Sequence, residues 1–291
     1  MNRGLAAASA LCVASSVMGF GGDPILWYTF DDQADPTVNL GTLGAAYDGG
    51  VLGDAGFVPF DGTFGVALDG DADWVIPGGD ENALDIADGD FTLMARLSTT
   101  FVDRASIAGS GVFWKEHTGS APGYVLNIRN STGIARFNIT DGTTSVVVST
   151  PEPVNDGVIH EIVAVRDADV LSLYVDDCLR GRTRIPASFG STAANPNQLI
   201  IGGRTIAAGG PTGGPNDDLE GTIGEIRVYT SAEHPPDARL GDANCDFVVD
   251  AIDLAGLLTA WGPCVGPCLF DLDLDGVVGP GDLAILLNNW G

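Results

Sequence analysis

Between Ile25 and Tyr229 the sequence is a succession of short runs in which apolar and polar residues alternate, separated by Gly, Asp, Asn and Pro. The clearest runs span residues 91–97 and 124–129, and further runs span residues 159–166, 171–175, 199–202 and 223–229. Alternation with a period of two predicts strands that bury one face. No amphipathic helix of three turns is predicted between them. So many short strands without helices predict a mainly β fold, an antiparallel sandwich of the jelly-roll kind.

The pattern changes after Thr230. Residues 232–240 form a short linker that contains two prolines, and beyond it one unit occurs twice, twenty-nine residues apart. Each unit has acidic residues at alternate positions and then apolar residues at i, i+3, i+4 and i+7, which predicts a loop followed by one helix. The apolar positions are Leu254, Leu257, Leu258 and Trp261, and then Leu283, Leu286, Leu287 and Trp290. We therefore predict a jelly roll over residues 23–231 and a small C-terminal α module of two loop-helix repeats over residues 241–291.

The acidic positions match an EF-hand calcium loop, which takes side-chain ligands at positions 1, 3, 5 and 12, a backbone carbonyl at position 7 and often a water at position 9. The predicted ligands are Asp242, Asn244, Asp246, the carbonyl of Val248, Asp250 and Asp253 in the first loop, and Asp271, Asp273, Asp275, the carbonyl of Val277 and Asp282 in the second. No residue from Leu240 to Gly291 is basic, so these carboxylates would repel one another without a cation. Two calcium ions are the expected cofactors; the alternative is an acidic turn and helix without metal.

Position 6 of such a loop turns sharply, and glycine normally occupies it. The second loop has Gly276 there, but the first has Phe247. A bulky residue at positive φ costs on the order of 1–3 kcal/mol. The first loop is therefore expected to bind calcium more weakly or with a distorted turn.

A duplicated calcium loop with a single helix, at the C-terminus of a secreted protein, resembles the type I dockerin over Gly241 to Gly291. The resemblance implies a cohesin-like protein partner. Recognition in that family uses small hydroxyl residues at loop positions 10 and 11. This chain has Ala251 and Ile252, and Pro280 and Gly281, at those positions, so it departs from the family's recognition pattern.

The first 22 residues have the pattern of a secretory signal peptide, with an apolar stretch from Leu5 to Val17 that is too short to span a bilayer. We expect a secreted or cell-surface protein without a transmembrane segment. Four cysteines follow the signal peptide, and they are Cys178, Cys245, Cys264 and Cys268. Disulfides persist outside the cell, and four cysteines allow three full pairings, all of which stay open here.

Several segments of the large domain share an order and spacing with a known family. They are Leu26 to Asp32, Gly65 to Gly70, Asp73 to Pro77, Asp156 to His160, Leu173 to Asp177 and Gly221 to Tyr229. In this order they resemble the LamG-like jelly roll of the concanavalin A-like lectin and glucanase superfamily, over about residues 25 to 230. The resemblance implies binding of glycans or proteins, often with one calcium ion, and usually no catalysis. The closing motif of that family reads Gly-x-Ile-Asp-Glu, and Gly224 stands where its Asp would be.

A glycosidase needs two carboxylates on either side of the scissile bond. Glu220 and Glu225 come closest, but Thr222 holds the position where that superfamily's catalytic triplet has Asp. His160 and Glu161 are not followed by a second His at Ala164, so the zinc-protease spacing fails as well. We predict no catalytic residues. Four aromatic residues either stack on sugar rings or belong to the core, and they are Tyr47, Trp74, Trp114 and Tyr124.

Charge narrows the set of partners. The chain has 13 Lys and Arg against 39 Asp and Glu, a net charge of −26. Nucleic acids and anionic membranes need clustered Lys and Arg, so neither is an expected partner. The sequence predicts a secreted, non-catalytic protein whose jelly roll recognises a polysaccharide or an extracellular protein, with a calcium-binding module for attachment or assembly in polysaccharide utilisation. The alternatives are a divergent glycoside hydrolase and a cell-surface structural or adhesion protein.

Overall fold

The computed structural model describes residues 20–101, 109–115, 122–129, 131–192, 195, 197–207, 210–211, 218–266 and 268–291. The predicted signal peptide lies outside the described residues up to residue 19. The rings of Phe20 and Tyr229 are in tilted contact with centroids 5.4 Å apart, and the amide of Gly22 donates to Glu233. Among all the residues that the structure describes, no helix has the length and apolar character needed to cross a membrane.

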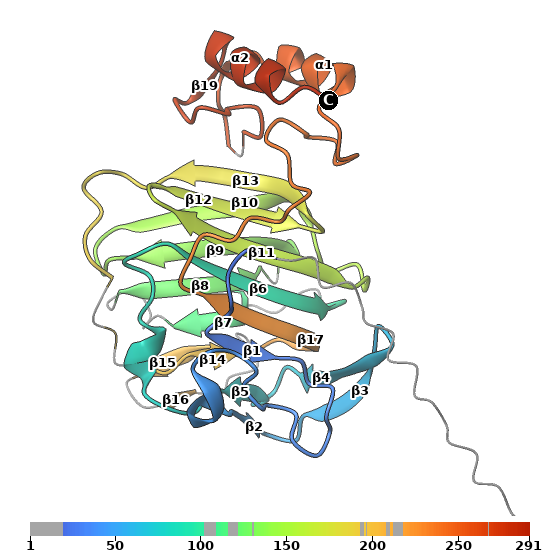
Figure 1. Cartoon of the computed structure of the whole chain (residues 1–291), viewed down its shortest axis with the longest axis vertical. Coiled ribbons are helices and arrows are strands. Elements are labelled where there is room, and N and C mark those ends of the chain that lie inside the picture. Colours follow the sequence, from blue (N-terminus) through green and yellow to red (C-terminus); the bar gives the residue numbers. More distant parts are fainter. Residues whose placement is uncertain are drawn as a thin grey trace, which may run out of the picture.

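Two antiparallel sheets form the body of the molecule (Figure 1). The eight-stranded sheet has the order β13 (Cys178–Arg184), β12 (Val170–Val175), β11 (His160–Asp167), β6 (Phe91–Ser98), β17 (Glu220–Tyr229), β4 (Thr63–Asp69) and β3 (Gly56–Phe60), and β1 (Leu26–Tyr28) also pairs with β17. The seven-stranded sheet has the order β10 (Ser145–Pro153), β9 (Ile134–Thr140), β8 (Gly123–Ile128), β7 (Ser110–Lys115), β14 (Ile200–Ile201), β5 (Trp74–Ile76) and β2 (Gly50–Leu52). The prediction of a mainly β, antiparallel jelly-roll-like fold is confirmed.

The core lies between the two sheets and follows the alternation in the sequence. On β6, Phe91, Leu93, Ala95 and Leu97 point into it, and Phe137 on β9 meets Phe91 edge to face at 5.8 Å. Outside the sheets, the described part of the jelly roll has only two helical turns, the 3₁₀ helices Gly44–Tyr47 and Glu81–Leu84. A short pair, β15 (Thr205–Ala207) and β16 (Gly210–Pro211), lies between β14 and β17 in the chain.

Both predicted C-terminal helices are present, as α1 (Ala251–Thr259) and α2 (Pro280–Asn288). The side chain of Asp250 caps α1, and Pro280 occupies the first turn of α2, where its missing amide costs nothing. Leu257 and Leu286 are fully buried against one another's repeat, in a small core of their own. Leu254, Leu283 and Ile285 pack against this core while partly exposed, and Leu258 and Leu287 lie at the surface.

The two repeats are related by their backbone pairing as well as by sequence. The strand after α1, β18 (Gly262–Pro263), pairs with β19 (Val277–Val278) of the second repeat. Gly291, three residues after the end of α2, donates its amide to Val249 of the first repeat at 3.0 Å. The C-terminal end of each repeat therefore contacts the loop of the other, and the two repeats form one structural unit.

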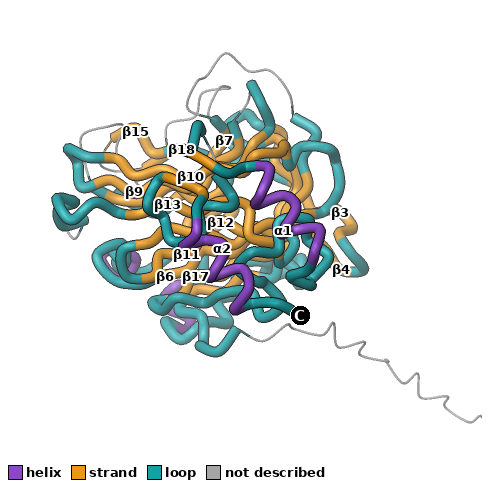
Figure 2. Tube along the Cα trace, turned by 90° about the horizontal axis from the view of Figure 1, so that it is seen from above, coloured by secondary structure: helices purple, strands orange, loops and turns teal. Residues whose placement is uncertain are grey.

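The C-terminal module lies over one end of the sandwich, beyond the edge strand β13, and the view from above shows both helices crossing that end (Figure 2). Residues 232–240, expected to link the two parts, lie on the side of the eight-stranded sheet that is turned away from the main core. Ala232, Ala238 and Leu240 pack there against an apolar cluster that includes Tyr174. The module is therefore packed against the jelly roll rather than suspended from it.

Candidate functional site

The second acidic loop, residues 271–282, brings three carboxylates together. Ligand oxygens of Asp271, Asp273 and Asp282 all lie within 4.8 Å of one another. Asp271 accepts the amides of Asp275 and Gly276, both at 3.0 Å, and Asp282 accepts the amides of Leu272 and Gly279. Burial and the neighbouring Asp282 carboxylate raise the pKa of Asp273. Like charges held this close favour a cation between them.

The first loop, residues 242–253, repeats most of these hydrogen bonds, but Asp242 accepts an amide from position 4 where Asp271 accepts one from position 5. Asp242 accepts the amide of Cys245 at 2.7 Å and that of Phe247 at 2.9 Å. Asp253 accepts the amides of Ala243 and Asp250, both at 2.9 Å, and it is almost completely buried at the start of α1. Its Asn244 occupies the position of Asp273, so this loop offers one carboxylate fewer among positions 1, 3 and 12. The total charge of the two loops is nevertheless equal, because each contains four aspartates.

Position 6 is phenylalanine in the first loop and glycine in the second, but the backbone there has the same conformation. Phe247 has φ +66° and Gly276 has φ +91°, so both loops turn through the left-handed region. Glycine enters this region without a steric cost, whereas phenylalanine does not. The first loop therefore has the same turn as the second and holds it with a strained residue.

The donor set of both loops fits calcium. Carboxylate, amide and carbonyl oxygens are what this hard cation takes, and the side chains of positions 1, 3 and 12 converge in the second loop. Of the predicted ligands, Asp271, Asp273 and Asp282 form the closest group, while Asp246 and Asp275 are bound to amides within their own loops. Calcium itself stays a prediction.

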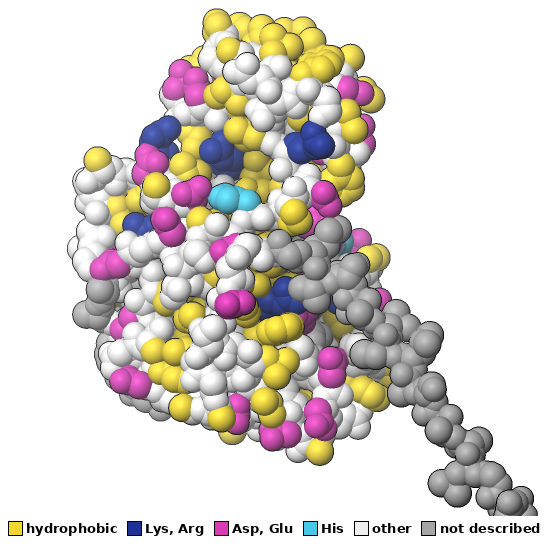
Figure 3. Space-filling model, viewed as in Figure 1, with side chains coloured by type: hydrophobic (Ala, Val, Ile, Leu, Met, Phe, Trp, Pro, Cys, Tyr) yellow, Lys and Arg dark blue, Asp and Glu magenta, His cyan; other side chains and the backbone are white. Residues whose placement is uncertain are grey.

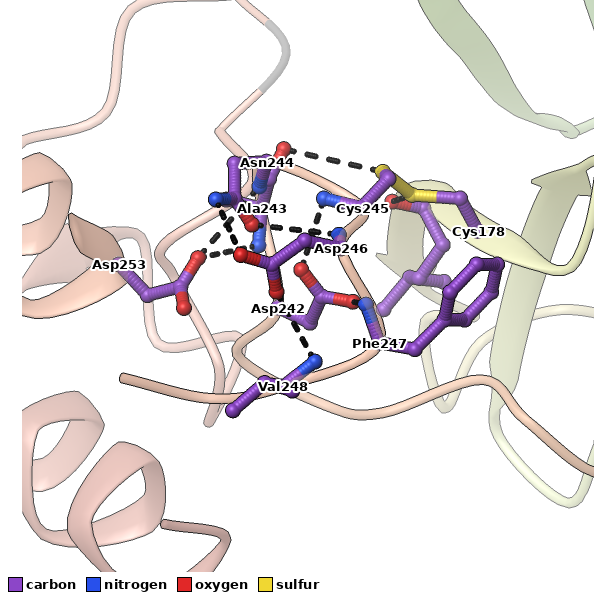
Figure 4. The surroundings of a disulfide bond; sticks show 10 residues. Cys178, Asp242, Ala243, Asn244, Cys245, Asp246, Phe247, Val248 and Asp253 are labelled. Carbon is purple, nitrogen blue, oxygen red and sulfur yellow. Dashed lines mark hydrogen bonds between the residues drawn. A yellow bond between two sulfur atoms is a disulfide. The ribbon is translucent and has the colours of Figure 1, made fainter. Parts of the chain in front are cut away.

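A disulfide joins the first loop to the jelly roll. Cys245, at loop position 4, is bonded to Cys178 at the start of β13, 67 residues earlier in the chain (Figure 4). The other disulfide, Cys264 to Cys268, stays within the module. The second loop contacts the same strand through hydrogen bonds, from Arg182 to the carbonyl of Leu272 at 3.0 Å and from Arg184 to that of Asp273 at 3.1 Å. One edge strand therefore contacts both acidic loops.

A third acidic group lies in the jelly roll, where the carboxylates of Asp54, Asp69 and Asp73 approach within 4.8 Å. Asp73 is buried, and its oxygens accept the amides of Asp54 at 2.9 Å and Asp69 at 3.1 Å. This side chain therefore fastens the turn between β4 and β5.

The carboxylates weighed as catalytic have structural partners. Glu225 accepts the indole N–H of Trp27 at 2.7 Å and pairs with Arg227, whose guanidinium lies over the Trp27 ring. Glu220 is exposed at the start of β17. The sequence did not single out Glu161 by itself, yet burial and the charge of Asp177 raise the pKa of this side chain to about 7. Glu161 lies on β11 beside Arg96 of β6, a contact that depends on the pairing of these strands and does not follow from the alternation alone.

The four aromatic candidates separate into two pairs. Tyr47 and Tyr124 belong to the main core, where their hydroxyls donate to the carbonyls of Asp80 and Leu84. Trp74 of β5 and Trp114 of β7 lie on the opposite, outer face of the seven-stranded sheet, because their neighbours Val75 and Phe113 point into the core. Their strands flank β14, so the two tryptophans lie on either side of it.

Polar side chains share this outer face with the two tryptophans. Asn127 of β8 and Arg136 of β9 are cross-strand partners, and Asn138 of β9 lies in the same row as Trp114. Arg204 places its guanidinium 5.0 Å from the centre of the Trp114 ring, and the indole N–H of Trp74 donates to Asp218 at 3.0 Å. We call Trp74, Trp114, Asn127, Arg136, Asn138 and Arg204 the outer face. The sequence did not point to the four polar members, although Asn127, Arg136 and Asn138 alternate with core residues on their strands.

Comparisons with known proteins agree with this architecture. The solved structure of domain 4 of AbnA, a GH43 extracellular arabinanase from Geobacillus stearothermophilus in complex with arabinotriose, has a TM-score of 0.52 at 12% identity and covers 73% of this chain and 95% of that one. The binding domain of botulinum neurotoxin DC in complex with SialylT has a TM-score of 0.52 at 11% identity, over 72% of this chain and 48% of that one. The binding domain of paraclostridial mosquitocidal protein 1 has a TM-score of 0.51 at 11% identity, over 73% and 50%. The chain thus spans about half the length of the two toxin domains.

A search of curated proteins finds no significant match. A family model described as the concanavalin A-like lectin/glucanases superfamily (Laminin_G_3) matches residues 69–237, which is more than half of the chain. The matched range runs from the end of β4 to just beyond β17 and so includes most strands of both sheets. This chain belongs to the concanavalin A-like lectin/glucanases superfamily.

Proposed function

We propose that this protein is a secreted, non-catalytic carbohydrate-binding protein, and that its C-terminal module binds two calcium ions and attaches it to a partner. The observation that carries the sugar-binding part is the outer face, where Trp74, Arg136 and Arg204 are half-buried and Trp114, Asn127 and Asn138 are buried on the same side of the sheet. Aromatic rings cover the apolar side of a sugar, and a few placed polar groups fix its orientation. Two proteins of similar fold, the arabinanase domain and the neurotoxin domain, have oligosaccharide ligands by their descriptions, which supports the proposal.

Binding to insoluble polysaccharides tests the sugar-binding part. The protein is mixed with each polymer of a panel, and its loss from solution is measured in calcium and again in chelator. Trp74→Ala is expected to weaken binding about tenfold, the usual effect of removing a central aromatic contact. Trp27→Ala is the matched control, because Trp27 also donates its indole N–H to a carboxylate but lies on the eight-stranded sheet.

Equal loss of binding in the two tryptophan variants would contradict the outer face as the binding surface. No depletion by any polymer would favour an extracellular protein as ligand, as the adhesion alternative requires. Release of reducing sugar from any polymer would overturn the non-catalytic assignment and return attention to the hydrolase alternative, with Glu220→Gln and Glu161→Gln as the first variants.

For the C-terminal module, the ion ligands would be the two loops described above, and calcium would neutralise their clustered carboxylates. Support for an attachment role comes from its surface, because apolar side chains gather on the end that points away from the jelly roll (Figure 3). Exposed residues occur in equivalent pairs from the two repeats, namely Val248 and Val277, Leu258 and Leu287, and Trp261 and Trp290. Exposed patches of this kind usually mark a protein contact.

A binding assay with purified cohesin domains, in calcium and in chelator, tests the attachment role. Calcium-dependent binding that is lost in Trp261→Ser/Trp290→Ser would support it. Absence of binding to any cohesin would exclude the dockerin type of attachment, for which the residues at positions 10 and 11 already depart from the pattern.

A further inference from the structure

We propose that Cys178 of the jelly roll is a positioning residue for the first acidic loop. Its disulfide to Cys245 holds residues 242–253 in the conformation that binds the ion, a task that glycine at position 6 performs in the second loop. The inference rests on the calcium binding proposed above and adds a specific role for a residue of the other domain. The jelly roll would support the metal site through this disulfide without supplying a ligand.

The first loop needs such support because of its backbone. Position 4 has a positive φ in both loops, +63° at Cys245 and +59° at Leu274. Position 6 adds a second positive φ, and here the loops differ, because Phe247 must adopt what Gly276 adopts freely. Without an ion or an external restraint, the first loop is therefore expected to relax away from this turn more readily than the second.

The disulfide restrains the loop next to the first predicted ligand. The amide of Cys245 and the amide of Phe247 both donate to Asp242, the ligand at position 1 (Figure 4). Holding the Cys245 backbone therefore also holds the carboxylate that would bind the ion. The anchor is firm, since Cys178 is buried and pairs with Val175 across the tight turn between β12 and β13.

The second loop has a weaker connection to the same strand. Arg182 and Arg184 reach it only through hydrogen bonds to two carbonyls, and Gly276 supplies the turn. The disulfide between Cys264 and Cys268 joins two residues of the module, and the Cys264 sulfur lies 3.6 Å from Asp271 of the second loop. Removing that disulfide is thus a matched control, because it removes a disulfide from the module without releasing the first loop.

The size of the effect follows from conformational populations. An ion that binds one conformation has an apparent dissociation constant equal to the intrinsic constant divided by the fraction of molecules in that conformation. If release from β13 reduces that fraction to about a tenth, the apparent constant rises about tenfold. Replacing Phe247 by glycine should restore most of the fraction, since the turn then carries no steric cost.

Calcium titration calorimetry on the whole protein provides the test. An Asp282→Asn background silences the second loop so that the first is read alone. Cys178→Ala/Cys245→Ala is expected to weaken calcium binding about tenfold, and adding Phe247→Gly should recover most of that loss. With the disulfide intact, Phe247→Gly should tighten binding no more than about twofold. Cys264→Ala/Cys268→Ala should leave the first loop unchanged.

The outcomes separate this inference from the proposed function. Unchanged affinity in Cys178→Ala/Cys245→Ala would overturn the positioning role while leaving calcium binding intact. A tenfold loss that Phe247→Gly does not recover would also overturn it, because general loosening of the module would then explain the loss. No heat from the unsubstituted first loop in the same background would overturn both this inference and calcium binding there. Thermal melting of each variant, followed by tryptophan fluorescence, verifies that the jelly roll is folded.

Discussion

Lys115 is the only lysine of the chain, and it is completely buried. Its ammonium lies 2.8 Å from Asp85 and donates to the carbonyl of Asn197 at 2.7 Å, and burial lowers its pKa. A buried ion pair contributes little relative to an apolar pair of the same volume, but losing one partner leaves an uncompensated charge.

Lys115→Met is therefore expected to lower the free energy of unfolding by about 3–5 kcal/mol, measured by urea denaturation. Lys115→Met/Asp85→Leu should regain much of that loss. Asp169→Asn, which removes an exposed ion pair with Arg184, should change stability by less than about 1 kcal/mol. Equal losses in the single and double variants would show that the packing of the lysine stem matters more than its charge.

Glu161 gives the stability of the jelly roll a dependence on pH. Burial and the nearby charge of Asp177 raise the pKa of this carboxyl to about 7 in the folded state. The unfolded chain releases this proton near pH 4.5, so the folded state holds more protons between the two values and loses stability as pH rises through them.

Glu161→Gln should remove this loss. The variant is expected to gain about 1–3 kcal/mol on the native protein between pH 4.5 and 7.5, in urea denaturation at a series of pH values. Glu152→Gln, at an exposed position of β10, is the control and should follow the native curve. A constant difference between Glu161→Gln and native protein at all pH values would contradict a raised pKa.

At the scale of elements, the loop-helix repeat combines a metal loop with a helix cap. Asp253 and Asp282 accept amides from their own loops and lie in the first turn of α1 and α2, so one carboxylate serves both elements. The repeat could be predicted from the sequence because the contacts between each loop and its own helix are local, whereas the pairing of β18 with β19 joins the two repeats. The strands could be predicted for the same reason, since an alternating run marks a half-buried strand whatever its partner is.

Gly276→Ala tests the turn of the second loop. A methyl group there meets no atom within 4 Å, so the only expected penalty is the strain of φ +91°. Strain of this kind should weaken calcium binding in the second loop about tenfold in titration calorimetry. Gly56→Ala, in the edge strand β3 and equally free of contacts, should leave calcium affinity unchanged. An unchanged affinity in Gly276→Ala would show that position 6 does not limit binding.

At the scale of the whole molecule, the C-terminal module and the sandwich form one packed unit. The contacts are the Cys178–Cys245 disulfide, the hydrogen bonds of Arg182 and Arg184 to the second loop, and the apolar packing of residues 232–240. Ion binding to the module should therefore stabilise the end of the sandwich that it covers.

Calcium at one hundred times its dissociation constant should add about 2.7 kcal/mol per bound site to the folded state. We expect the midpoint of thermal unfolding, followed by tryptophan fluorescence, to fall when chelator replaces calcium. Magnesium at the same concentration is the control, since it demands a smaller, octahedral site. Identical melting in calcium and chelator would mean that the loops do not bind the ion under these conditions.

The sequence by itself determined the elements: antiparallel strands from an alternation of two, and two loop-helix units from an exact spacing of acidic and apolar residues. These patterns are local, so they hold before any partner is known. Only the tertiary structure decided which of the three cysteine pairings forms, because it depends on the edge strand β13 lying beside the first loop. It also decided that Trp74 and Trp114 lie on the outer face while Tyr124 of β8 and Tyr47 of the 3₁₀ helix Gly44–Tyr47 are in the core. Which of them face the core depends on how the strands are paired and packed, and those contacts join residues far apart in the chain.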